Sequence, residues 1–341
     1  SNYYLMGVYT EEVERERRLL KKENFSSDEI QEIAQIERLS QIKKAYKQFK
    51  QNQSEGKKST LKQLCKMLER KNLYNELPFI SQNVEKCLEA ADIFINNDDD
   101  NRSLISLKKT LLRYICLIMY PGLLLPTPVE RCMQLAYTAK ANSGCISRQV
   151  GAVITDRAYH LLSIGWNQQP EGQLPCSYRN LIELCSHFSN EVYSDYENED
   201  LQNLIKENVR KEYDCIDNPL KIQGRFPVFC FKDLFNRKEG KENQVHPRAL
   251  HGEETAFLNL GPVGKEQAKG GCLFTTSSPC ELCAKKAMYM EISYIYYVEP
   301  YSGISYKHVL SAGPKEKRPQ FILFTGAVGR AYMQLYTPLL P

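Results

Sequence analysis

The sequence lacks the features that mark several large classes of protein. Its net charge of +4 over 341 residues is far below the basic balance of a dedicated nucleic-acid-binding protein. The longest apolar run, residues 114–125, is interrupted by Pro121 and Gly122 and is shorter than the roughly 20 residues that span a bilayer. We therefore expect no membrane segment and no extended phosphate-backbone groove.

Secretion signals and a disulfide framework are also missing. Residues 3–9 form a short apolar run with no basic residue before it, which is typical of a strand rather than of a secretory leader. The twelve cysteines are scattered, which favours a reducing compartment in which some of them bind metal. These observations predict a cytoplasmic protein.

A nucleotide-binding P-loop is absent as well. Residues 54–60 contain a Lys-Ser-Thr sequence, but the glycine that the Walker pattern places before the lysine and serine pair is missing. No other segment matches the pattern. We therefore expect no ATP binding of the kind that depends on this loop.

The composition and length of the chain are typical of a soluble protein with two domains. Apolar residues make up 42% and charged residues 25%, and 341 residues exceed one typical domain. A Pro-Thr-Pro linker begins at Pro126. We predict a mostly helical region over residues 1–125 and a second domain over residues 126–341, with an insertion at about 171–247.

The order of elements in the second domain predicts its fold class. Hydrophobic periodicity predicts a helix followed by a two-stranded hairpin, and after the insertion helices and strands alternate. The expected elements are a helix at 127–142, strands at 149–155 and 160–166, a helix at His251, and then a strand at 271–277, a helix at Cys280 and strands at 294–299 and 320–325. This order predicts an α/β fold, a three-layer α/β/α sandwich around a mixed sheet.

Two short motifs carry the chemistry. Cys280 and Cys283 follow a predicted strand and begin a helix, so both sulfurs face one point and the helix N-terminus favours the thiolate. Alone, this spacing also fits a redox pair. With His251 placed 29 residues earlier, it predicts a Zn²⁺ ion with three protein ligands and one open position, the catalytic arrangement.

Glu253 is the predicted catalytic residue. It lies two residues after His251 and reaches the open metal position without being a ligand. Zinc lowers the pKa of bound water to roughly 7, so Glu253 can accept a proton and pass it on during attack on an amine-bearing ring. Glu254 is the adjacent alternative, but its side chain points about 100° further round the helix.

The motifs resemble those of the deoxycytidylate deaminases of the cytidine deaminase superfamily. Residues 251–256 are similar to the family's His-Ala-Glu-x-Asn-Ala, with Gly252 and Thr255 as departures, and residues 149–154 and 165–170 are similar to its first hairpin. The resemblance implies the cytidine-deaminase sandwich, a deoxycytidine nucleotide substrate and a sugar contact at Asn167. Phosphate must then meet cations or amides near the pocket, and Arg148 and Ser278 are the further predicted substrate-binding residues.

Residues 130–137, 143–149 and 326–332 narrow the resemblance to bacterial anti-phage deaminases that act on dCTP and dCMP. In the first domain, residues 5–19 resemble a strand and helix of P-loop kinases, and residues 83–96 resemble their last helix and strand. The resemblance implies a partial kinase-like region, nucleotide depletion during infection, a homo-oligomer and an inhibitory small RNA. It also implies that a second, structural zinc at Cys176, Cys185 and His187 is an option.

Two other functions remain open from the sequence. One is deamination of a base within RNA or DNA, against which the modest net charge argues. The other is a non-catalytic nucleotide sensor in which zinc only braces the fold, against which the intact Glu253 argues.

Overall fold

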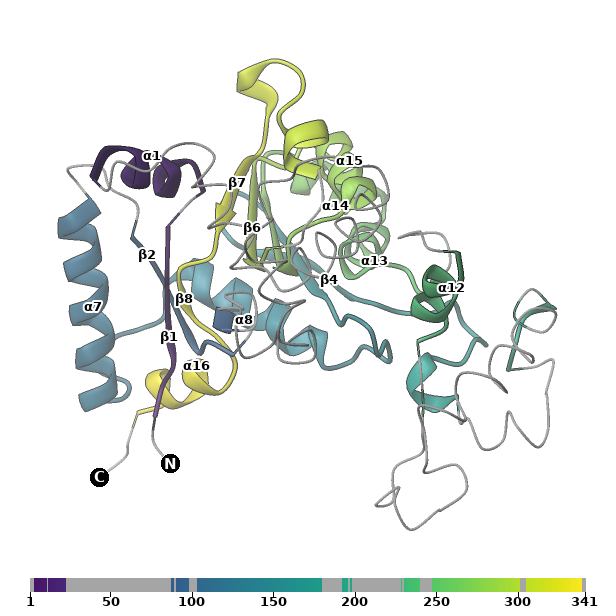
Figure 1. The fold of residues 1–341 in the computed structure, drawn as a ribbon, viewed down its shortest axis with the longest axis horizontal. Helices are drawn as coiled ribbons and strands as arrows, with labels where there is room; N and C mark the ends of the chain where they lie inside the picture. Colours follow the sequence, from purple (N-terminus) through teal and green to yellow (C-terminus); the bar gives the residue numbers. More distant parts are fainter. Residues whose placement is uncertain are drawn as a thin grey trace, which may run out of the picture. The chain divides into compact units, whose positions relative to one another are not determined.

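The computed structural model describes residues 3–10, 12–22, 87–88, 90–97, 103–179, 192–195, 197, 228, 230–239, 247–300 and 305–338. These residues form two compact units, of which unit 1 comprises residues 1–130 and 323–341 and unit 2 residues 131–322. Figure 1 shows the helices and strands of both. In the part of the chain described, no helix combines the length and apolar character needed to cross a membrane.

Unit 1 is built on a three-stranded sheet whose strands come from both ends of the chain. β1 (Met6–Tyr9) pairs in parallel with β2 (Ile93–Asn96), and β2 pairs antiparallel with β8 (Gly326–Ala327). Helix α1 (Glu12–Lys22) follows β1, and α7 (Ser103–Met119) and α16 (Gly329–Tyr336) also belong to this unit. Its core joins β2, α7, β8 and α16 through the buried side chains of Ile93, Ile95, Tyr114, Leu117, Ala327, Ala331 and Leu335.

A buried carboxylate, Glu130, connects four segments of unit 1. Its side chain accepts hydrogen bonds from the hydroxyls of Tyr114 at 2.7 Å and Tyr336 at 2.6 Å. The backbone amides of Thr127 and Ala327 donate to it at 2.9 Å and 3.2 Å. Because buried charge is stabilised only when it is well hydrogen-bonded, this set of donors accounts for a glutamate that is 1% exposed.

Unit 2 contains a mixed five-stranded sheet with the strand order β4-β3-β5-β6-β7. β3 pairs antiparallel with both β4 and β5, whereas β5 and β6 are parallel. The strands are β3 (Gly151–Thr155), β4 (Leu161–Trp166), β5 (Cys272–Ser277), β6 (Tyr294–Glu299) and β7 (Gln320–Leu323). The parallel pair is joined by α15 (Glu281–Tyr289), the crossover that such a pair requires.

Helices cover both faces of this sheet. On one face, Ala152 and Ile154 of β3 pack with Ala256 of α13 (Gly252–Asn259) in a core that also includes α14 (Gly261–Ala268) and α15. Successive strand residues alternate between faces, and Gly151 accordingly lies against the backbone of Ala136 in α8 (Pro128–Lys140). The predicted α/β fold with a mixed sheet is confirmed.

The predicted strands and helices of residues 126–299 are found within a few residues of their expected bounds. Two outcomes differ or stay open. The expected strand at 320–325 ends at Leu323, and the chain then contributes β8 and α16 to unit 1, so this grouping differs from the predicted domain of 126–341. The strands β1 and β2 occur as expected, while the kinase-like assignment and most of the insertion at 171–247 concern residues largely outside those described, and both stay predictions.

Candidate metal centre and active site

Two helix N-termini bring the predicted ligands together. His251 is the N-cap residue of α13, and Cys280 is the N-cap residue of α15, one turn before Cys283. The Nδ1 atom of His251 lies 3.3 Å from Sγ of Cys280 and 3.6 Å from Sγ of Cys283. Among the described residues this is the one group of three histidine, cysteine or acidic side chains that is close enough to share an ion.

The geometry of this group fits zinc. A tetrahedral ion bound at about 2.3 Å from sulfur and about 2.05 Å from nitrogen separates those two atoms by about 3.6 Å. The observed separations of 3.3 Å and 3.6 Å agree with that value. One nitrogen and two sulfurs also form a donor set typical of Zn²⁺, and three protein ligands leave one position for water or substrate.

The electrostatics of the two thiols favour metal binding. The pKa of Cys280 is lowered to about 4, chiefly by a hydrogen bond from Cys283 and then, against the effect of burial, by His251. The same hydrogen bond, together with burial, raises the pKa of Cys283. The lowered pKa of Cys280 favours the thiolate, the form in which a cysteine would bind zinc.

Glu253 lies beside the ligands without joining them. It is 3% exposed, and its Oε1 accepts a hydrogen bond from Thr275 of β5 at 3.2 Å. Burial raises the pKa of its carboxyl above the usual range. Glu254, the alternative acid, instead forms an ion pair with Lys286 on α15 and points to a partly exposed surface, so the geometry favours Glu253.

Two glycines allow α13 to approach the sheet this closely. A Cβ atom at Gly165 would lie 2.2 Å from the backbone nitrogen of Ala256 in the middle of α13. A Cβ atom at Gly252 would lie 2.5 Å from the carbonyl oxygen of Val150. The glycine at position 252 is thus required by close packing between the start of α13 and the residue that precedes β3.

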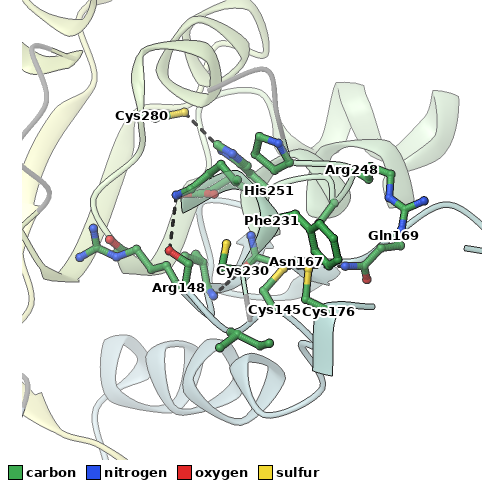
Figure 2. A pocket seen from close by; sticks show the side chains of 18 of the residues that line it. Cys145, Arg148, Asn167, Gln169, Cys176, Cys230, Phe231, Arg248, His251 and Cys280 are labelled. Carbon is green, nitrogen blue, oxygen red and sulfur yellow. Dashed lines mark hydrogen bonds between the residues drawn. The ribbon is translucent and has the colours of Figure 1, made fainter. Parts of the chain in front are cut away.

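His251, Cys280 and Glu253 line a pocket in unit 2. Figure 2 shows His251 and Cys280 at its upper side and Asn167 near its middle. Asn167 is buried, and its Oδ1 accepts a hydrogen bond from the Val150 amide at 2.5 Å. Because this bond fixes the orientation of the amide group, Nδ2 is the atom of Asn167 that remains for a ligand.

The other two predicted substrate-binding residues also line this pocket. Arg148 lies 3.6 Å from a carboxylate oxygen of Glu299, whose other oxygen pairs with Lys140 at 3.0 Å. Ser278 is buried, and its backbone amide donates to the carbonyl oxygen of Glu299 at 2.8 Å. Six of the seven predicted site residues thus line one cavity, the seventh, Cys283, lies next to His251, and the roles of these residues toward substrate stay predictions.

Several residues that line the pocket were not predicted. They come from the margins of the insertion and from the loop before β3, and they are Cys145, Cys176, Arg179, Glu197, Cys230, Phe231, Lys232 and Arg248. Arg248 is only three residues before the ligand His251, a proximity that the sequence does show. Cys176 lies here, but Cys185 and His187 are outside the described residues, so the second zinc stays a prediction.

The mixed sheet and two helix N-termini together place one histidine, two cysteines and a buried glutamate that is not a ligand. This arrangement defines a zinc-dependent hydrolytic deaminase. A family model described as the cytidine and deoxycytidylate deaminase zinc-binding region matches residues 126–299. The chain belongs to this family. No curated protein matches the chain significantly.

Solved structures with low overall similarity include deaminases. The dCMP deaminase of cyanophage S-TIM5 in its apo form is 17% identical, with a TM-score of 0.32 over 59% of this chain and 100% of that one. The same enzyme in complex with dCMP and dUMP is 18% identical, with a TM-score of 0.34 over 59% of this chain and 99% of that one. A bifunctional diaminohydroxyphosphoribosylaminopyrimidine deaminase and reductase from Thermotoga maritima is 11% identical, with a TM-score of 0.28 over 57% of this chain and 36% of that one.

Proposed function

We propose that the protein deaminates deoxycytidine nucleotides, dCMP or dCTP, to the deoxyuridine nucleotides with release of ammonia. The observation that carries the proposal is the position of Glu253, which is buried next to the three metal ligands and shares their pocket. The family match supports hydrolytic deamination, and the hairpin of residues 149–170 with its buried Asn167 supports a cytidine nucleotide as the substrate.

In the proposed reaction, the ligand residues His251, Cys280 and Cys283 would hold zinc, which when bound polarises a water molecule for attack on a ring carbon. Glu253 carries the protons. It accepts one from the attacking water and delivers it to ring nitrogen N3, and it transfers the second to the departing amine. Oxygen replaces nitrogen at C4, both water protons are accounted for, and no oxidant or reductant is needed.

The burial of Glu253 suits this role. A carboxyl whose pKa is raised by burial exchanges protons more readily near neutral pH than an exposed glutamate does. The hydrogen bond from Thr275 holds the carboxylate in one orientation. A zinc ion that only braced the fold would not require a desolvated acid beside its open position.

The test is a zinc-replete assay of ammonia release from dCMP, dCDP, dCTP and the corresponding ribonucleotides. We expect Glu253→Gln to lower kcat by about 10²- to 10⁴-fold, the usual contribution of general acid and base catalysis, while bound zinc stays at the wild-type level. Retained activity in that variant would reject the role of Glu253. Activity on cytidine within RNA or DNA, with none on mononucleotides, would instead support a polynucleotide deaminase.

The resemblance to anti-phage deaminases extends the proposal to nucleotide depletion during infection. Homo-oligomerisation and inhibition by a small RNA belong to the same proposal. It is tested by comparing phage plaque numbers and dCTP pools in cells that carry the wild-type gene or the Glu253→Gln variant. Equal protection by both genes would separate any defence function from deamination.

A further inference from the structure

The residues that line the pocket include more cationic than acidic side chains. Among all the residues that line it, four carry cationic side chains, Arg148, Arg179, Lys232 and Arg248, whereas only Glu197 and Glu253 are acidic. Even with both carboxylates ionised, the four cationic side chains outnumber the two acidic ones. The excess favours an anionic ligand.

Arg179 is not free to bind that ligand. Its side chain is 2% exposed, its Nη1 lies 2.7 Å from Oε1 of Glu197, and its guanidinium carbon lies 4.5 Å from the centre of the Phe231 ring. Nε donates to the carbonyl oxygen of Leu174 at 3.3 Å. Ion pairing, stacking and burial fix this arginine as part of the wall.

Arg248 has a longer ion-pair contact than Arg179 does. Its Nη1 lies 3.7 Å from Oε2 of Glu197, an oxygen that already accepts the Ser194 amide at 3.0 Å. Nη2 donates to the carbonyl oxygen of Val192 at 3.3 Å. Its buried Nε atom has no hydrogen-bond partner in the described part of the chain. Two guanidinium groups thus share one carboxylate, and Arg248 is the less tightly bound of the two.

The backbone places Arg248 three residues before the ligand His251. An antiparallel bridge between Gln168 and Leu250 sets Asn167 across from His251 and Gln169 across from Ala249. Along this ladder the two segments run from Asn167 and His251 to Gln169 and Ala249, with Arg248 one residue further, and all five residues line the pocket. Three residues of chain span at most about 10 Å, a distance on the scale of a pyrimidine ring and its sugar.

Arg148 lies on a different side of the pocket. Figure 2 shows its guanidinium group at the far side from Arg248, and Gln169 on the same side as Arg248. Arg148 is directed toward Glu299, which also pairs with Lys140. Lys232 pairs with the neighbouring Asp233 at 3.1 Å and contacts Ser147 at 3.4 Å. Among the cations that line the pocket, Arg248 is thus the one that is nearest in sequence to the ligand His251 and that lies on the same side as Gln169 (Figure 2).

We infer that Arg248 binds the 5′-phosphate of the substrate and provides the main selection of nucleotides over nucleosides. The inference rests on the proposed function. A guanidinium group suits phosphate because its donors match two phosphate oxygens at once. Neutral nucleosides would fill the base and sugar positions and leave this arginine without its anion.

The experiment measures binding of the product dUMP and of deoxyuridine to the zinc-loaded full chain by calorimetry. The variants are Arg248→Gln, Arg248→Lys, Arg148→Gln and, as a matched control, the exposed Arg131→Gln. For Arg248→Gln we expect dUMP affinity to fall roughly 10- to 100-fold, the loss typical of a charged hydrogen bond, while deoxyuridine affinity is unchanged. The dUMP affinity of Arg248→Lys should lie between those of Arg248→Gln and the wild type, and the dUMP affinity of Arg131→Gln should equal that of the wild type.

Three results would overturn the inference. The first is that Arg248→Gln binds dUMP with the affinity of the wild type. The second is that this variant loses affinity for dUMP and deoxyuridine equally, which is the signature of a structural role. The third is that Arg148→Gln, and not Arg248→Gln, loses affinity for dUMP alone. Failure of the proposed function is recognised separately, because the wild-type enzyme would then release no ammonia from dCMP or dCTP. Zinc content and thermal unfolding confirm that each variant is folded.

Discussion

The hydroxyl group of Thr275 donates a hydrogen bond to Oε1 of Glu253 at 3.2 Å and lies 2.8 Å from the carbonyl oxygen of Ser277. Thr275 is completely buried in β5, the strand that leads to Cys280. One strand therefore positions both a metal ligand and the acid that is carried by a different helix. A single hydroxyl proton serves two acceptors, so Thr275 also links the orientation of Glu253 to the turn before Cys280.

Removing this hydroxyl should affect turnover more than substrate binding. For Thr275→Val we expect kcat on dCMP to fall by about 10-fold with little change in KM, because one hydrogen bond that orients the carboxylate is lost. Thr275→Ser, which keeps the hydroxyl, should recover most of the rate. Equal kcat values for the valine variant and the wild type would show that Thr275 does not position Glu253.

Zinc content should depend on Cys280. Serine is a poor zinc ligand, so Cys280→Ser should hold well under one zinc per chain by elemental analysis, whereas Cys87→Ser, at an exposed position, should match the wild type. Metal that binds only the folded state stabilises it by about 4 kcal/mol when free zinc is about 1,000 times Kd. A chelator should therefore lower the Tm of the wild type and leave that of Cys280→Ser nearly unchanged.

Alanine at position 252 should be destabilising, although it is the residue that the resembling motif carries. Its Cβ would lie 2.5 Å from the carbonyl oxygen of Val150, and overpacking of this kind costs about 1–3 kcal/mol. We expect a lower Tm for Gly252→Ala and a lower kcat, because α13 carries both His251 and Glu253. An unchanged Tm would mean that the start of α13 can move away from Val150 at no cost.

The carboxylate of Glu130 should be a major contributor to the stability of unit 1. In Glu130→Gln, an amide replaces one acceptor oxygen, so at least one of the donors from Tyr114, Tyr336 and Thr127 loses its partner. We expect a loss of about 2–4 kcal/mol, measured as a lower denaturant midpoint. Glu171→Gln, at an exposed loop position, provides the control and should leave the midpoint unchanged.

The parts of the site that the sequence predicts best are those fixed by local spacing. Cys280 and Cys283 share a helical turn, and His251 and Glu253 are two residues apart, so chemistry and periodicity alone predict that these four side chains act together. The alternation of strands and helices in residues 126–299 was predicted for the same reason, because each element carries its own hydrophobic pattern.

What the sequence did not predict depends on contacts between distant segments. Arg248, Arg179 and Phe231 reach the pocket through tertiary packing at the margins of the insertion, where no regular pattern precedes them. The end of β7 is a second example. Residues 320–325 read as one strand, but Gly326 has a φ of 149° and the chain leaves the five-stranded sheet to pair with β2. That partner lies more than 200 residues earlier, beyond the reach of local sequence patterns.

Because β8 and α16 complete the sheet and core that the first 130 residues begin, the deaminase unit is held at both of its ends by the other unit's chain. A single protease cut at one junction leaves the two units tethered through the second. A fragment that starts at residue 126 keeps Ala331 and Leu335 but loses Ile93, Ile95 and Leu117, on which they pack. An isolated deaminase is therefore better prepared by trimming both ends, at about residues 131 and 322, than by removing the N-terminal region alone.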